Sequence, residues 1–165
     1  MFVMPPLHPI LVHVPIVMLI FSLLFELAGR ALDADWWRRA AFAMLVIGVI
    51  GAGAAVLTGR PSGDRAEHQG VAERAVDEHE EAGRLTLWLA LGALLARLIA
   101  VRPGPARGAI ATLALLLQIA AAVSVGVAGY RGGLLVFEHG AAVRVHGHPV
   151  PSDGPAKTEK TDEKD

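Results

Sequence analysis

Histidine is the residue type whose placement in this chain could support cofactor chemistry. Neutral imidazole binds iron, copper, zinc and nickel, and two histidines on facing helices at similar depth are compatible with a b-type haem. The chain has no cysteine, which excludes thiolate metal sites, iron-sulfur clusters and the Cys-x-x-Cys-His attachment of a c-type haem. The chain has seven histidines, which are His8, His13, His68, His79, His139, His146 and His148.

Two arrangements of these histidines as ligands remain open from spacing. In the first, His13 and His79 form the best pair for a haem b iron, and His8 with His139 forms a second, shallower pair. In the second, three or four of the same four side chains hold one zinc or copper ion, with nearby glutamates as further ligands. Those glutamates are Glu78, Glu80 and Glu138. The other three histidines also fit a scattered, solvent-exposed role.

His13 draws attention because it lies inside the first apolar run, two residues before Pro15. Proline has no backbone N–H, so Pro15 leaves the Leu11 carbonyl without its usual helical partner. An ionisable group at membrane depth normally faces the bundle interior and marks a ligand site or pathway. The plain alternative is a histidine satisfied by a neighbouring carbonyl.

His79 is predicted to share one helix face with Gly83, Thr86, Ala90 and Ala93. Small side chains let helices pack closely, but they also make room for a flat cofactor between helices. The second apolar run, with its GVIGAGAAVLTG segment, repeats the feature. Close packing alone and packing around a cofactor both remain open.

Four apolar segments must position these residues. They cover about 10–28, 40–58, 85–101 and 109–128, and each is long enough to cross the roughly 30 Å hydrocarbon core of a bilayer. The short links between the first and second and between the third and fourth segments make consecutive helices antiparallel. The sequence therefore predicts an all-α integral membrane protein, an up-and-down bundle of four transmembrane helices over 1–148, followed by a disordered polar tail over 149–165.

Three further expectations concern polar and glycine-rich segments. Glu26 and Arg97 lie near the ends of their apolar runs, where long charged side chains usually extend to the interface. The GYRGG segment after the fourth run is typical of a turn, and the LLVFEH segment that follows it could form a short strand or an interfacial helix.

Charge distribution bears on partners and orientation. The formal net charge is −1, with no basic aromatic stripe, so nucleic acid is a poor partner. Helix parity places every histidine on one face of the membrane, while arginines concentrate in the two short links of the other face. By the positive-inside rule, we expect the two short links to be cytoplasmic and both termini to be periplasmic or extracellular.

The sequence resembles a bacterial family of four-helix membrane proteins known as domain of unknown function 2231. The similarity rests on HPILVHVP at residues 8–15, the LTG that ends the second apolar run, His79, and YRGGLLVFEHG at residues 130–140. The resemblance implies that His8, His13, His79 and His139 are the family's recurring histidines. Relatives occur fused to or beside cytochrome c and Rieske iron-sulfur domains, which implies electron transfer near the outer face.

Together these observations predict an electron carrier rather than a self-contained enzyme, since no nucleophile and base are paired in the sequence. We expect one or two b-type haems, quinone or another membrane component on one side of the reaction, and a separate cytochrome c or Rieske-type protein on the other. The alternative is a non-redox protein that binds or transports zinc or copper, or a structural membrane subunit. Homo-oligomers are compatible with either.

Overall fold

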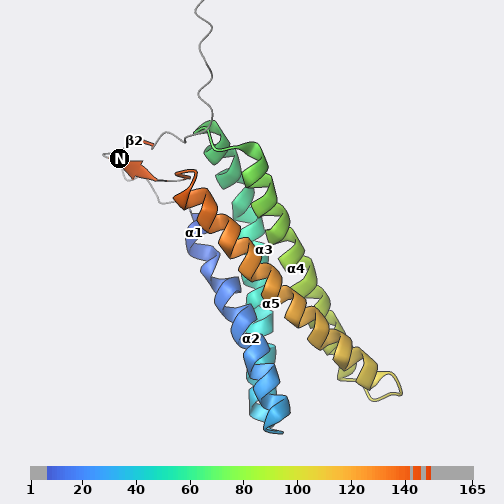
Figure 1. The fold of residues 1–165 in the computed structure, drawn as a ribbon. Helices are drawn as coiled ribbons and strands as arrows, with labels where there is room; N and C mark the ends of the chain where they lie inside the picture. The colour runs from blue at the N-terminus through green and yellow to red at the C-terminus, as the bar shows by residue number, and fades with distance from the viewer. Residues whose placement is uncertain (1–6, 142, 146–147, 150–165) are drawn as a thin grey trace, which may run out of the picture.

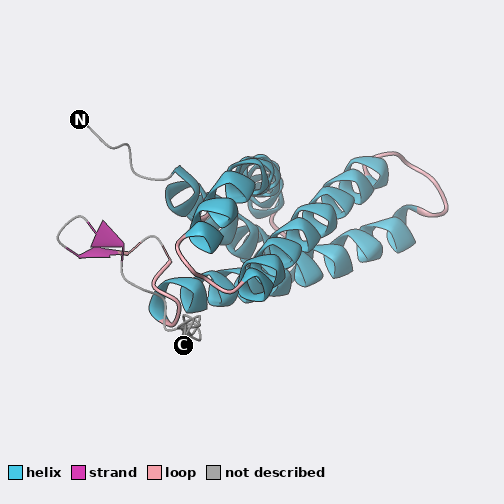
Figure 2. Cartoon of the chain, turned by 90° about the horizontal axis from the view of Figure 1, so that it is seen from above, coloured by secondary structure: helices cyan, strands magenta, loops and turns pink. Residues whose placement is uncertain are grey.

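The computed structural model describes residues 7–141, 143–145 and 148–149, and this part of the chain is almost entirely helical. Its elements, in chain order, are α1 (Leu7–Leu11), α2 (His13–Ala31), α3 (Asp35–His68), α4 (Glu73–Ala100), α5 (Arg107–Phe137), β1 (Arg144–Val145) and β2 (His148–Pro149). The two short strands pair antiparallel and lie apart from the helices (Figure 2). Apart from Pro149, the predicted polar tail lies outside the described residues.

The helices form two antiparallel hairpins, α2 with α3 and α4 with α5. The hairpins lie together at the end that carries α1 and diverge toward the two links at the other end (Figure 1). Four helical stretches in the described chain are long and apolar enough to cross a membrane, and they are Leu7–Ala31, Asp35–His68, Glu73–Ala100 and Arg107–Phe137. The predicted all-α bundle with four transmembrane-capable helices is confirmed.

The first of these stretches contains a slight break at Val12, between α1 and α2. The Val12 N–H donates to the His8 carbonyl at 3.1 Å, and the Ile16 N–H reaches the Val12 carbonyl at 3.4 Å. Pro15 cannot donate to the carbonyl of Leu11, as expected from the sequence. The chain therefore passes from α1 into α2 with little change of direction, and His8 stays attached to the first span.

Each helix continues beyond the apolar run that predicted it, because hydropathy marks only the part that suits hydrocarbon. The link between α2 and α3 is three residues long rather than the eleven that separate the apolar runs, and Asp33 turns the chain with a φ of 47°. At the other end, α3 continues through Pro61 to His68, and α4 begins at Glu73. The polar segment between the second and third spans is thus mostly helical.

The expectation of a turn at GYRGG is wrong. Residues 130–133 are helical, and α5 ends only at Phe137, so LLVF is its last turn rather than a strand or a separate helix. Glycine costs a helix roughly 1 kcal/mol relative to alanine, but packing against neighbours often overrides that preference. Here the absence of a side chain at Gly132 gives His79 room to contact α5, as described below.

The core of the bundle consists of small residues and two leucines. Its fully buried members come from all four long helices, and they are Leu19, Leu45, Ala90, Ala93, Ala121 and Val125. Thr86 is also buried, which confirms that the small-residue face predicted for the third span packs inward. A Cβ on Gly48 would lie 2.6 Å from the Leu19 side chain, so α2 and α3 can approach this closely only with glycine there.

Candidate functional site

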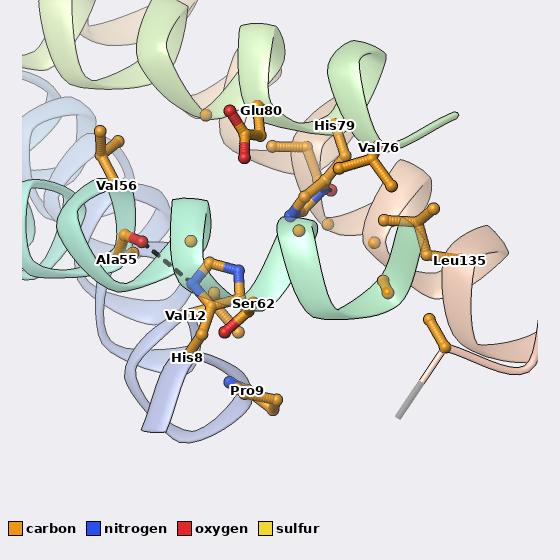
Figure 3. Close-up of a pocket in the computed structure, with 18 of the residues that line it drawn as sticks. His8, Pro9, Val12, Ala55, Val56, Ser62, Val76, His79, Glu80 and Leu135 are labelled. Carbon is orange, nitrogen blue, oxygen red and sulfur yellow. Dashed lines mark hydrogen bonds between the residues drawn. The ribbon is translucent and has the colours of Figure 1, made fainter. Parts of the chain in front are cut away.

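A cavity of about 770 Å³ opens among the helices at the end of the bundle that carries α1 (Figure 3). We call it the histidine cavity, because His8 and His79 both line it. Glycine, alanine and valine from α3, α4 and α5 make up a large part of its walls. This size lies within the range of about 300–1,000 Å³ that is usual for pockets that bind small molecules and cofactors.

His8 from α1 and His79 from α4 meet in this cavity. Their ring centroids are 5.9 Å apart, and the ring planes are nearly perpendicular, at 83°. Both side chains are half-buried, and Figure 3 shows the two rings facing one another across the space between α3 and α5. Residues 71 positions apart in the sequence are thus brought to one point.

Each ring is oriented by a backbone carbonyl of the neighbouring helix. His8 Nδ1 lies 3.0 Å from the carbonyl oxygen of Ala55, and His79 Nδ1 lies 3.0 Å from that of Ala128. A carbonyl oxygen only accepts hydrogen bonds, so Nδ1 is the protonated nitrogen of both neutral rings. The unprotonated Nε2 of each ring is therefore available as an acceptor or as a metal ligand.

Glycine permits both of these contacts. Gly59 and Gly132 each lie four positions after the alanine whose carbonyl is used, which is one helical turn. A Cβ on Gly59 would lie 3.3 Å from His8 Cε1, and a Cβ on Gly132 would lie 3.0 Å from His79 Cε1. A side chain at either position would press on the imidazole, which would have to shift by a few tenths of an ångström.

The two histidine contacts belong to a repeat that relates the two hairpins. His79 follows His8 by 71 positions, and Ala128 and Gly132 follow Ala55 and Gly59 by 73. The same shift of 73 carries the buried positions 41, 45, 48, 51, 52 and 55 of α3 onto the buried positions 114, 118, 121, 124, 125 and 128 of α5. The histidine pair thus lies where two similar hairpins face one another, a relation that the sequence analysis missed although Ala-x-x-x-Gly occurs in both helices.

Basic side chains gather around the same cavity. Arg60, Arg65 and Arg84 line it, together with Glu80. Arg84 pairs with Glu80 at 3.5 Å, and Arg65 donates to the Ser62 hydroxyl at 3.2 Å, whereas Arg60 has no hydrogen-bond partner within the described chain. Three arginines against one glutamate favour a ligand that carries negative charge.

The other candidate histidines do not take part in the pair of His8 and His79. His13 touches the edge of the cavity but is exposed, so the structure brings His8, not His13, to His79. His139 follows the end of α5 and makes no ring contact with His8 among the described residues. His68 is exposed at the end of α3. His146 lies outside the described residues, and only the backbone of His148 is described.

A metal ion held by protein side chains alone usually has three or four of them as ligands. Within the described residues, no group of three or more histidine, aspartate or glutamate side chains is placed to hold one. The glutamates considered as further ligands are engaged in ion pairs, Glu78 with Arg74 at 3.1 Å and Glu80 with Arg84. Glu138 is exposed directly after α5.

A second polar cluster lies near the opposite end of the bundle. Glu26 is only 4% exposed, and its carboxylate lies 2.5 Å from an Arg97 nitrogen and 2.8 Å from an Arg30 nitrogen. The expectation that Glu26 and Arg97 extend separately to the interface is therefore wrong, because each residue has its counter-charge on the other hairpin. Arg97 also donates to the Arg38 carbonyl at 2.9 Å.

Comparison with known proteins agrees with the fold. The family model described as "Predicted membrane protein (DUF2231)" matches residues 4–145, which include every helix and both residues of the histidine pair. No curated protein and no solved structure matches the chain. Since the match covers most of the 165 residues, the chain belongs to the DUF2231 family of membrane proteins.

Proposed function

We propose that this chain is a membrane-embedded electron-transfer protein that binds one b-type haem between His8 and His79. One observation carries the proposal. Two imidazoles from different hairpins, each with Nδ1 held by a carbonyl and Nε2 free, face one another 5.9 Å apart in a cavity. Ligand histidines in proteins commonly donate their other ring N–H to such an acceptor, which orients the ring and raises its basicity.

The spacing of the rings suits a single metal atom between them. A metal held by imidazole nitrogens lies about 2 Å from each of them, so its two ligand rings must lie close together. The centroids of the His8 and His79 rings are 5.9 Å apart. Two protein ligands are enough for haem, because the porphyrin supplies four more nitrogens. A bare zinc ion usually requires three or four protein ligands, so this alternative has less support.

The walls of the cavity also suit a flat, anionic cofactor. Gly83 and Gly133 line the cavity, and a Cβ placed on either would meet no atom within 4 Å, so open space lies beside them. Haem carries two propionate groups, and arginine is the side chain best suited to bind carboxylates. Arg60 has no partner in the described chain and could bind one propionate, with Arg65 close by along α3.

The protein's own residues would hold and position this group. His8 and His79 would hold its iron, and the carbonyls of Ala55 and Ala128 would fix the ring orientations. A bound haem b would supply a one-electron couple between Fe(III) and Fe(II). The cavity lies at one end of the bundle, so a partner at that membrane surface, such as a cytochrome c or a Rieske-type protein, could exchange electrons with it, and quinone could serve as the membrane partner.

The test is haemin binding by purified full-length protein, followed through the Soret band. We expect one haem per chain, and we expect His8→Ala and His79→Ala each to lose the six-coordinate spectrum and most of the affinity. His68→Ala is the matched control, because His68 does not line the cavity, and it should bind like the parent protein. Equal binding by the parent, His8→Ala and His79→Ala would contradict the proposal. Stoichiometric zinc or copper without iron would favour the non-redox alternative.

A further inference from the structure

The membrane end opposite the histidine cavity carries a groove of about 290 Å³ between the start of α3 and the end of α4. The start of α3 and the end of α4 lie at the end where the two hairpins diverge (Figure 1). Its lining consists of Asp35, Arg38, Arg39, Phe42, Arg97 and Val101, and we call it the arginine groove. Three of its six residues are arginines.

The positive charge of the groove is only partly neutralised by the protein. Arg38 is engaged by Asp35 at 2.7 Å and by Asp33 at 3.3 Å. Arg97 uses one terminal nitrogen for Glu26 and the Arg38 carbonyl, while its other terminal nitrogen is buried without a hydrogen-bond acceptor among the described residues. Arg39 is exposed and has no ion pair within the same part of the chain. Arg39 therefore has donors to spare on the groove surface, and Arg97 has one further unpaired donor that lies buried beneath it.

The two hairpins differ at this place, although they repeat one another elsewhere. The shift of 73 that relates α3 to α5 carries Arg38, Arg39 and Phe42 onto Ala111, Thr112 and Leu115. The equivalent position on the other hairpin thus lacks both arginines and the aromatic ring. Simple packing of the bundle does not need this set, since the other hairpin packs without it.

From these contacts we infer that the arginine groove binds the phosphate of an anionic phospholipid from the adjacent leaflet. Guanidinium groups match phosphate oxygens with paired hydrogen bonds, and basic grooves between transmembrane helices commonly bind anionic head groups. Phe42 and the exposed Val101 supply an apolar surface for the acyl chains, beside the charged donors. A free inorganic anion would use the arginines but not this apolar surface.

The experiment measures the thermal unfolding midpoint of delipidated full-length protein in detergent during titration with phosphatidylglycerol, phosphatidylcholine or inorganic phosphate. A ligand that binds the folded state raises the midpoint as its concentration increases. We expect phosphatidylglycerol to raise it in a saturable way and the other two probes to have little effect. Arg39→Gln should weaken the apparent affinity about five-fold, since one basic residue near the membrane surface contributes about that factor.

Arg102→Gln is the matched control, because Arg102 is exposed at the same membrane end but does not line the groove. It should retain the affinity of the parent. If both variants weaken binding equally, the effect is general surface charge and the inference is wrong. It is equally overturned if phosphate alone reproduces the shift, or if phosphatidylglycerol and phosphatidylcholine act alike.

Should Arg39→Gln fold poorly without lipid, Arg39→Lys is the second variant. It keeps the charge but loses the planar fork of the guanidinium, so it should show a smaller loss of affinity in the same titration. This test does not depend on haem binding.

Discussion

His79 packs against α5 at a place where that helix has no side chain, because position 132 is glycine. His8 meets α3 in the same way at Gly59. In both contacts an alanine carbonyl one turn earlier accepts the Nδ1–H of the ring. At the scale of single residues, the orientation of the histidines therefore depends on an alanine and a glycine on the helix opposite each of them.

Gly132→Ala should weaken haemin binding. The added methyl group would lie 3.0 Å from His79 Cε1, so the ring would have to shift by a few tenths of an ångström from the position in which it bonds to Ala128. Losing the group that orients a metal ligand typically costs about 10–100-fold in affinity. Gly126→Ala is the control, since a Cβ there would meet no atom within 4 Å and Gly126 lies on the same helix. Equal affinities of the two variants in a haemin titration would refute the idea that Gly132 is needed to orient the His79 ring.

The choice between His8 and His13 shows what residue types alone cannot decide. Both histidines belong to one motif, and His13 was favoured because it lies deeper in the apolar run. At about 100° per residue, however, five positions turn the side chain through roughly 140° around the helix. Only one of the two can face α4, and that choice depends on how α1 packs against α3, which no local pattern specifies.

At the scale of helices, the two hairpins are similar units that pack through small residues and are joined by a few polar contacts. The Thr86 and Ser124 hydroxyls lie 2.8 Å apart within the second hairpin, and Gln118 donates to the Ser22 hydroxyl at 2.6 Å between hairpins. The ion pair of Glu26 with Arg97 adds a charged contact between the hairpins. Polar contacts of this kind fix how one hairpin is placed on the other.

Glu26→Gln should destabilise the protein strongly. The substitution keeps the shape of the side chain but leaves Arg97, whose side chain is only 17% exposed, without its counter-charge. Breaking one side of a buried ion pair typically costs about 3–5 kcal/mol in the free energy of unfolding. Glu78→Gln breaks an exposed pair with Arg74 and should cost less than about 1 kcal/mol. Unfolding by denaturant in detergent measures the free energy of unfolding of both variants. Similar small decreases for the two would show that the ion pair of Glu26 contributes little to stability.

Hydropathy was enough to predict four membrane-crossing helices, their antiparallel order and the small buried face around Thr86 and Ala90. Hydropathy underestimated the length of the helices, because polar residues such as Arg65 and Glu73 extend them beyond the apolar runs. Pro61 and the glycines at 129, 132 and 133 are locally unfavourable to a helix, yet tertiary contacts keep α3 and α5 helical through them. The pairing of Glu26 with Arg97 required knowledge of which helices face one another.

At the scale of the whole molecule, the two ends of the bundle differ in chemistry. The described histidines lie at the end that carries α1, and the arginine groove lies at the end with the two short links. By the positive-inside rule the links are predicted to be cytoplasmic, which would place the histidine cavity on the opposite, outer face of the same membrane. This orientation stays a prediction from charge.

Cysteine labelling tests the orientation directly, because the chain has no native cysteine. Ala34→Cys lies in the link between α2 and α3, and Gln69→Cys lies in the turn between α3 and α4. A membrane-impermeant maleimide applied to intact spheroplasts should label Gln69→Cys, whereas Ala34→Cys should react only after the membrane is opened. The reverse pattern would place the histidine cavity on the cytoplasmic side.

The central claim, a haem held by His8 and His79, is tested most directly by the absorption spectrum of the protein purified from haem-replete membranes. The account predicts a Soret band in the oxidised protein and sharp alpha and beta bands after reduction with dithionite, which are typical of a low-spin haem b with two histidine ligands. A colourless preparation that also fails to take up added haemin would contradict it.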